Sequence, residues 1–224
     1  MASQMTFSLT PMARENMAGT IYRQIKQRLM TGALLPGQTL TLRTLSESLG
    51  VSQTPVREAL LQLVSERALA MTPGKSVQVP VLSREELQEL RAVRLNLEVM
   101  ATEAATPRIT KAEIKKLAAI HKDMMRDKLN NDMAGTLAKN YEFHFALYQA
   151  AKMPHLLAII EGLWTQTGPS LTYLYRKPFI HLDGTHPHLQ LIEALNDHEV
   201  PAAVAAIKLD VAGYGAALME RLPE

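Results

Sequence analysis

Apolar residues recur at helical spacing along most of the chain, and glycine and proline separate the helical stretches. In residues 20–32, Ile21, Ile25 and Leu29 fall on one face of a predicted helix. Residues 41–50 predict a second short helix with Gly50 at its C-terminal cap. The periodic part of the chain therefore begins with two short helices.

A third helix follows the second after a tight turn. Thr54 is expected to cap this helix, Pro55 to occupy its first position, and Val56 and Leu60 to begin its buried stripe. Two short helices in this order, the second with an arginine in its first turn, are typical of a helix-turn-helix. Two strands around residues 73–74 would complete it as a β-hairpin wing.

Beyond a linker near residue 80 the pattern is helical almost to the end. Ser83 with Glu86, and Thr110 with Glu113, form capping boxes that open the first two of these helices. We expect helices over residues 84–106, 110–129, 132–151, 155–175, 188–196 and 201–222. A long polar loop separates the fourth of them from the fifth.

These elements predict a mainly α protein, with an N-terminal winged helix-turn-helix followed by an all-helical antiparallel bundle of about six helices. Residues 1–18 lack periodicity and would form a flexible arm. Residues 19–80 would form the winged helix-turn-helix domain, and residues 81–224 the helical domain.

Composition narrows the function. The chain has no cysteine, which excludes disulfides and thiolate metal sites. No apolar run approaches about 20 residues, so we expect a cytoplasmic protein that does not enter a membrane. Residues 1–80 contain eight Lys/Arg and four Asp/Glu, whereas residues 81–224 contain sixteen and eighteen. This asymmetry indicates that the N-terminal part meets a polyanion.

The motif LPGQTLTLRTLSESLGVSQTPVREALLQLVSERAL resembles the DNA-reading segment of the GntR family of bacterial transcription regulators. The later stretches RAVRLNLEVMATEAA, NYEFHFALYQAA and HLQLIEAL are similar to the all-helical FCD effector domain of its FadR-type branch. The resemblance implies a homodimeric repressor or activator on a near-palindromic double-stranded DNA operator. It also implies that a small molecule, usually an organic acid, controls this binding from the helical domain.

On this resemblance, Arg43 and Arg57 match arginines that contact DNA, and Ser52, Gln53 and Thr54 open the recognition helix. The alternatives are a solvated helix face for Arg43 and a local ion pair for Arg57. The family usually has arginine where this chain has Gln53. Glutamine reads adenine where arginine reads guanine, so we expect a different base preference at one operator position.

The predicted wing also departs from the family. It carries Lys75 after Pro-Gly, where Arg-Gly or His-Gly is usual. We expect Lys75 to contact phosphate or the minor groove.

Four positions match the metal site that the resemblance implies in the helical domain: Asn140, His144, His188 and Asp210. The family pattern has an Asp and a His four apart, then two further histidines, so an amide and a carboxylate replace two of the usual ligands. His144, His188 and Asp210 would still supply two imidazoles and a carboxylate for Zn, Ni or Mn, with the Asn140 carbonyl in a fourth position. The alternative is a metal-free polar cavity that binds the effector directly.

The effector itself is expected to contact Arg94, Asn140 and Tyr173. Arg94 would anchor a carboxylate, or instead pair with Glu98 one helical turn later. His181 and His186 match no family position and are expected to face solvent.

Two other functions are open to this sequence. In one, the helical domain is only a dimerisation platform for a DNA-binding protein. In the other, the chain is a metal-dependent enzyme, which the lack of a paired nucleophile and base or a glycine-rich phosphate loop disfavours.

Overall fold

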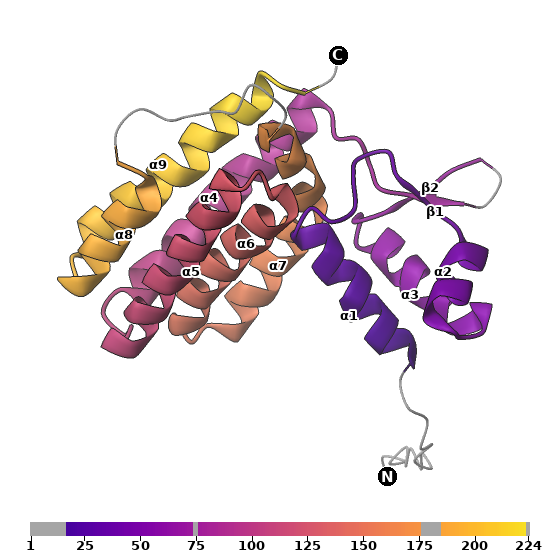
Figure 1. Ribbon diagram of the computed structural model, residues 1–224, viewed down its shortest axis with the longest axis horizontal. Helices are drawn as coiled ribbons and strands as arrows, with labels where there is room; N and C mark the ends of the chain where they lie inside the picture. Colours follow the sequence, from indigo (N-terminus) through magenta and orange to yellow (C-terminus); the bar gives the residue numbers. More distant parts are fainter. Residues whose placement is uncertain (1–16, 74–75, 176–184, 223–224) are drawn as a thin grey trace, which may run out of the picture.

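The computed structural model describes residues 17–73, 76–175 and 185–222. Figure 1 shows two parts, a small N-terminal domain and a larger bundle of long helices, with the first helix lying between them. The predicted arm falls almost entirely in residues 1–16, and Gly74 and Lys75 of the predicted wing also lie outside the described residues.

The N-terminal domain is the predicted winged helix-turn-helix. Its helices are α1 (Met17–Met30), α2 (Leu42–Leu49) and α3 (Gln53–Ser65), and its strands are β1 (Thr39–Leu40), β2 (Ala70–Met71) and β3 (Val77–Gln78). The strands form one antiparallel sheet in the order β1-β3-β2. Apolar side chains from α1, α3 and the sheet make a core of their own.

The two predicted strands of the wing are confirmed, since β2 and β3 pair antiparallel. Strand β1 was not predicted, and it adds a third strand because the extended residues after the Pro36-Gly37 turn pair with β3. The third helix was expected to be capped by Thr54, but α3 begins at Gln53 with Ser52 as its N-cap residue. Ser52 has the extended backbone of a cap, and Thr54 already lies in the first helical turn.

The bundle consists of α4 (Arg84–Ala105), α5 (Lys111–Leu129), α6 (Met133–Ala150), α7 (Pro154–Thr167), α8 (Pro187–Asn196) and α9 (Val200–Met219). Both predicted capping boxes are confirmed, at Ser83 with Glu86 and at Thr110 with Glu113. The α-helix expected to reach residue 175 stops at Thr167 and continues as a 3-10 helix, η1 (Gly168–Tyr175). Pro169 has no N–H to donate to the preceding turn, so the α-helical pattern cannot continue.

Helix α9 is long and apolar enough, by length and composition, to cross a membrane, which the sequence analysis overlooked. In the fold, however, it packs against α4 and α8 (Figure 1). It also carries the buried carboxylate of Asp210 into contact with His144. One side of α9, which includes Ile207 and Asp210, is buried in the bundle, while residues such as Leu209 are exposed.

The two parts of the molecule meet along α1. Lys26 of α1 forms an ion pair with Glu161 of α7 at 3.2 Å. Gly168, where α7 passes into η1, packs directly on the backbone of Leu29 and Met30, so that a Cβ at this position would collide with α1. The end of α7 is therefore fitted closely to the first helix of the N-terminal domain.

Candidate DNA-binding surface and effector cavity

The start of α3 presents a row of polar side chains to solvent. Ser52, Gln53, Thr54 and Arg57 are all exposed, while Val56 on the opposite face is fully buried against the rest of the domain. Among the described residues, no ion pair involves Arg57, so its predicted local pairing is not found. The guanidinium is thus free to meet a ligand outside the protein.

Arg43 on α2 is also exposed, and its Nε donates to Glu47 at 2.9 Å. Ion pairs between exposed side chains contribute at most about 1 kcal/mol, so this one does not hold Arg43 away from a phosphate. Lys75, the remaining predicted DNA contact, lies outside the described residues.

A cavity opens in the helical domain between α4, α5, α6, α7, η1 and α9, beside His186 at the start of α8. Its polar lining includes three of the four predicted metal-site residues. The lining is formed by Leu87, Arg91, Arg94, Met124, Leu137, Asn140, His144, Trp164, Thr167, Leu171, Leu174, His186, Asp210, Val211, Tyr214, Gly215 and Leu218. The cavity is therefore walled mainly by apolar side chains, with a few polar groups that converge, as ligand sites commonly are.

The structure brings His144, His188 and Asp210 together beside this cavity. Nε2 of His144 lies 3.2 Å from Oδ2 of Asp210, and Nε2 of His188 lies 3.7 Å from Oδ1. All three side chains are buried, and one ligand atom from each lies within 4.8 Å of the others. His188 Nε2 and Asp210 Oδ1 have no hydrogen-bond partner among the described residues.

A chain of hydrogen bonds sets the proton position on His144. The Tyr148 hydroxyl donates its proton to Glu98 at 2.5 Å, so its oxygen can only accept from Nδ1 of His144, 3.1 Å away. A neutral imidazole has one N–H, so a proton on Nδ1 leaves a lone pair on Nε2. In this neutral tautomer the lone pair would face Oδ2 of Asp210, 3.2 Å away.

The chain of hydrogen bonds from His144 through Tyr148 ends at Glu98, which is completely buried. Its carboxylate accepts from Trp164 Nε1 at 2.8 Å and from Arg94 Nε at 2.7 Å, as well as from Tyr148. Burial and the neighbouring Glu98 charge raise the pKa of Tyr148 well above its ordinary value, so the hydroxyl keeps its proton.

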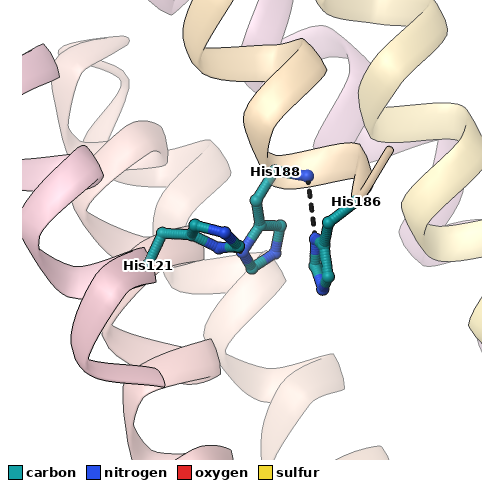
Figure 2. Close-up of side chains that lie close together, drawn as sticks. All are labelled: His121, His186 and His188. Atoms are coloured by element: carbon teal, nitrogen blue, oxygen red, sulfur yellow. Dashed lines mark hydrogen bonds between the residues drawn. The ribbon is translucent and has the colours of Figure 1, made fainter. Parts of the chain in front are cut away.

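His188 also lies beside two further histidines, His121 and His186. Figure 2 shows His121 of α5 pointing toward His188, with His186 at the start of α8 beside them. Nδ1 of His121 lies 3.4 Å from Nδ1 of His188. The His188 backbone N–H donates to Nδ1 of His186 at 3.1 Å, the dashed line in Figure 2.

The expectation that His186 faces solvent is therefore wrong. As the N-cap of α8 it turns its ring back over the helix start and into the cavity lining. His181 lies outside the described residues. One nitrogen from each of His121, His186 and His188 lies within 4.8 Å of the others. Because Nδ1 of His186 already accepts the backbone N–H, these rings serve better as support for His188 than as ligands of their own.

Burial controls the charges in this cluster. It lowers the pKa of His121, that of His186 to about 4, and that of His188 well below the ordinary value. Burial alone would raise the pKa of Asp210, but the adjacent His188 and His144 outweigh it and lower that pKa to about 2. The cluster thus places the Asp210 carboxylate, whose pKa is lowered, beside His188, whose pKa is lowered by burial.

Of the three residues predicted to contact the effector, two line the cavity and one does not. Asn140 and Arg94 line the cavity, but Tyr173 does not: it packs with Leu218 and Met219 in an apolar cluster. Arg94 also forms the predicted pair with Glu98, donates Nη1 to Thr167 at 3.0 Å and stacks on Trp164. Its Nε and Nη1 groups therefore donate within the protein.

Comparison with known proteins agrees with this architecture. The sequence matches the gntR family of bacterial regulatory proteins over residues 17–79 and the FCD domain over residues 89–212. The chain belongs to the GntR family and carries an FCD domain. It is therefore a transcriptional regulator, since these families and the relatives below are regulators and not enzymes.

Among relatives, the regulator McbR of Escherichia coli K12 is 37% identical over 155 residues, 69% of this chain and 70% of McbR. The repressor GlaR of the same strain is 27% identical over 202 residues, 85% of this chain and 86% of GlaR. The solved structure of E. coli McbR/YncC superposes with a TM-score of 0.86 at 30% identity, covering 94% of this chain and all of that one. A GntR regulator from Rhodococcus, 18% identical with a TM-score of 0.75 over 92% of this chain and 99% of its own, shows the same fold.

Within this GntR regulator, the structure adds functional candidates that the sequence analysis missed. His121 continues the buried stripe of Ile114 and Leu117 on α5, so a histidine at an apolar position was the available signal. Arg91 and Tyr214 carried no such signal. Arg91 begins the FCD-like stretch RAVRLNLEVMATEAA, but only the fold places it and Tyr214 in the cavity.

Proposed function

We propose that this regulator binds a near-palindromic operator as a cytoplasmic homodimer and that a metal-bound small acid in its FCD domain controls the binding. Residues 19–80 would bind DNA, and residues 81–224 would bind the effector and the second subunit. Arg57, Gln53, Ser52 and Thr54 on α3 would read bases and sugar-phosphate groups, while Arg43 would contact phosphate. Their exposure at the start of the recognition helix supports this assignment.

One observation carries the metal site: two buried imidazoles direct Nε2 at the two oxygens of one buried carboxylate. When both imidazoles carry their proton on Nδ1, no donor lies between them and Asp210, and a divalent cation would satisfy all of these atoms together. The unpartnered His188 Nε2 and Asp210 Oδ1, 3.7 Å apart, fit this reading. Zn, Ni or Mn suits two imidazoles and a carboxylate, with Asn140 beside them in the cavity.

When bound, the metal would supply a positive charge that holds an acidic group of the effector. The chain's own residues would orient the ligands. Tyr148 would hold the His144 proton on Nδ1, and His121 would accept the Nδ1 proton of His188, which frees both Nε2 atoms.

The same groups connect the cavity to the DNA-binding domain. Arg94 joins Glu98 to Thr167, and the next residue, Gly168, packs on α1. We propose that occupation of the cavity shifts this end of α7 against α1 and so changes the spacing of the two recognition helices in the dimer.

The test is elemental analysis of the full chain purified without a histidine tag. We expect stoichiometric metal in the wild type and in His155→Ala, a control at an exposed histidine, but loss of the metal in His144→Ala. Each preparation would also be titrated with its selected operator, with and without chelator. If no variant carries metal and neither chelator nor small acids change operator affinity, the helical domain is a dimerisation platform only.

A further inference from the structure

The wall of the cavity formed by α4 and α9 holds an arginine with an unused donor. Arg91 lines the cavity, and its Nη1 is buried without a hydrogen-bond partner among the described residues. A buried N–H left without an acceptor costs free energy, more so on a charged group. Arg94, one turn later on the same helix, differs because its Nε donates to Glu98 and its Nη1 to Thr167.

Gly215 on α9 makes room for this side chain. A Cβ at residue 215 would collide with Cδ and Nη1 of Arg91, so the guanidinium lies directly over the glycine. The glycine is buried within a regular helix, where alanine would be favoured by roughly 1 kcal/mol. The close approach of α9 to Arg91 accounts for glycine at this position.

Tyr214, next to that glycine, has a second unused donor. The backbone N–H of His188 can only donate, so Nδ1 of His186 is an acceptor and the ring proton sits on Nε2. Nε2 then donates to the Tyr214 hydroxyl oxygen, 3.2 Å away. The hydroxyl proton of Tyr214 is left to bond elsewhere, and no acceptor for it occurs among the described residues.

We propose that Arg91 and Tyr214 bind an acidic group of the effector, separate from the group held by the metal ligands. Both donors line one cavity with His144 and Asp210, and apolar residues stand beside them: Leu87, Leu174 and Leu218. The effector is then a small acid with two acidic groups joined by a short apolar segment. This inference rests on the proposed function only for the acidic group held by the metal. The group held by Arg91 and Tyr214 is argued from the unused donors of those two residues.

The experiment is calorimetric titration of the full-length, metal-loaded protein with succinate, glutarate and adipate, each against the monoacid of equal chain length. At least one diacid should bind tenfold or more tightly than its monoacid. Arg91→Met should remove this advantage, a loss of roughly tenfold to hundredfold, because a charge-assisted hydrogen bond is lost. Tyr214→Phe should lose less, and Arg91→Lys should recover part of the advantage.

Gly215→Ala tests the same site without removing the charge, because the added methyl displaces Arg91 and should also reduce the diacid advantage. Arg84→Met, at an exposed arginine that opens the same helix, is the matched control and should bind like the wild type. Metal content should be the same in every variant. Chelator-treated protein separates the two proposals: residual diacid binding that is sensitive to Arg91→Met supports this subsite even where no metal is bound.

Two results would overturn the proposal. One is a wild type that binds no diacid more tightly than its monoacid. The other is a diacid advantage that persists in both Arg91→Met and Gly215→Ala.

Discussion

The DNA-facing end of α3 and the cavity of the helical domain hold polar side chains in opposite environments. Gln53 and Arg57 are exposed, whereas Glu98, His144 and Asp210 are buried and held by specific partners. An exposed polar side chain supports little of the fold, so its substitution changes binding alone. A buried polar group is part of a network, so its substitution changes the stability of the fold together with the site.

This difference separates the two tasks of the regulator. The DNA-binding surface can vary in sequence with little cost to folding, because the core beneath it is made of apolar residues. The effector cavity cannot vary so freely, since its polar groups hold one another in position. Three substitutions would break or sharpen the contrast.

Glu98→Gln should have the largest effect. It leaves the Arg94 charge buried without its partner and replaces an acceptor by an amide that must face Trp164 or Tyr148. We expect the free energy of unfolding to fall by about 3–5 kcal/mol, measured by urea denaturation. Glu103→Gln, at an exposed position of the same helix, should stay within about 0.5 kcal/mol of the wild type. A loss below about 1 kcal/mol for Glu98→Gln would show that the buried network does not stabilise the fold.

Arg57→Ala should weaken operator binding with no change in stability. Loss of a base or phosphate contact costs about 1–3 kcal/mol, which is roughly a fivefold to 150-fold increase in Kd by fluorescence anisotropy. The free energy of unfolding should remain within about 0.5 kcal/mol. Arg108→Ala removes an exposed arginine from the helical domain and serves as the charge-matched control. Equal affinities for both variants would place the DNA contact elsewhere.

Gln53→Arg should have the smallest effect on operator affinity. It should instead change which base is preferred at one operator position. Operators selected from a random DNA pool should change from adenine to guanine at one position in each half-site, because arginine pairs with guanine and glutamine with adenine. Each protein should bind its own selected operator with similar Kd. Identical selected operators would mean that residue 53 does not reach a base edge.

Local sequence patterns predicted most of the fold. The capping boxes at Ser83 and Thr110, and the cap glycine at residue 50, each act over a few residues, so the pattern alone places these helix ends. The errors arose where a distant contact decided the outcome. Strand β1 forms only because β3 lies beside it.

The candidate site was predictable only in part. His144, His188 and Asp210 were proposed together by resemblance, and the fold brings them into contact. His186, Arg91 and Tyr214 were misjudged or missed, because their roles depend on the packing of α4 and α9 and on a backbone N–H at the start of α8.

The sequence by itself determined the order of the elements, the recognition helix with its exposed polar face, and the chemical types available in the helical domain. These follow from periodicity, caps and residue identity, which act between near neighbours. Only the tertiary structure decided which nitrogen of each histidine faces Asp210, which arginine is already paired, and which donors remain unused. Those properties depend on partners far along the chain, such as Thr167 for Arg94, 73 residues away, and no local pattern specifies them.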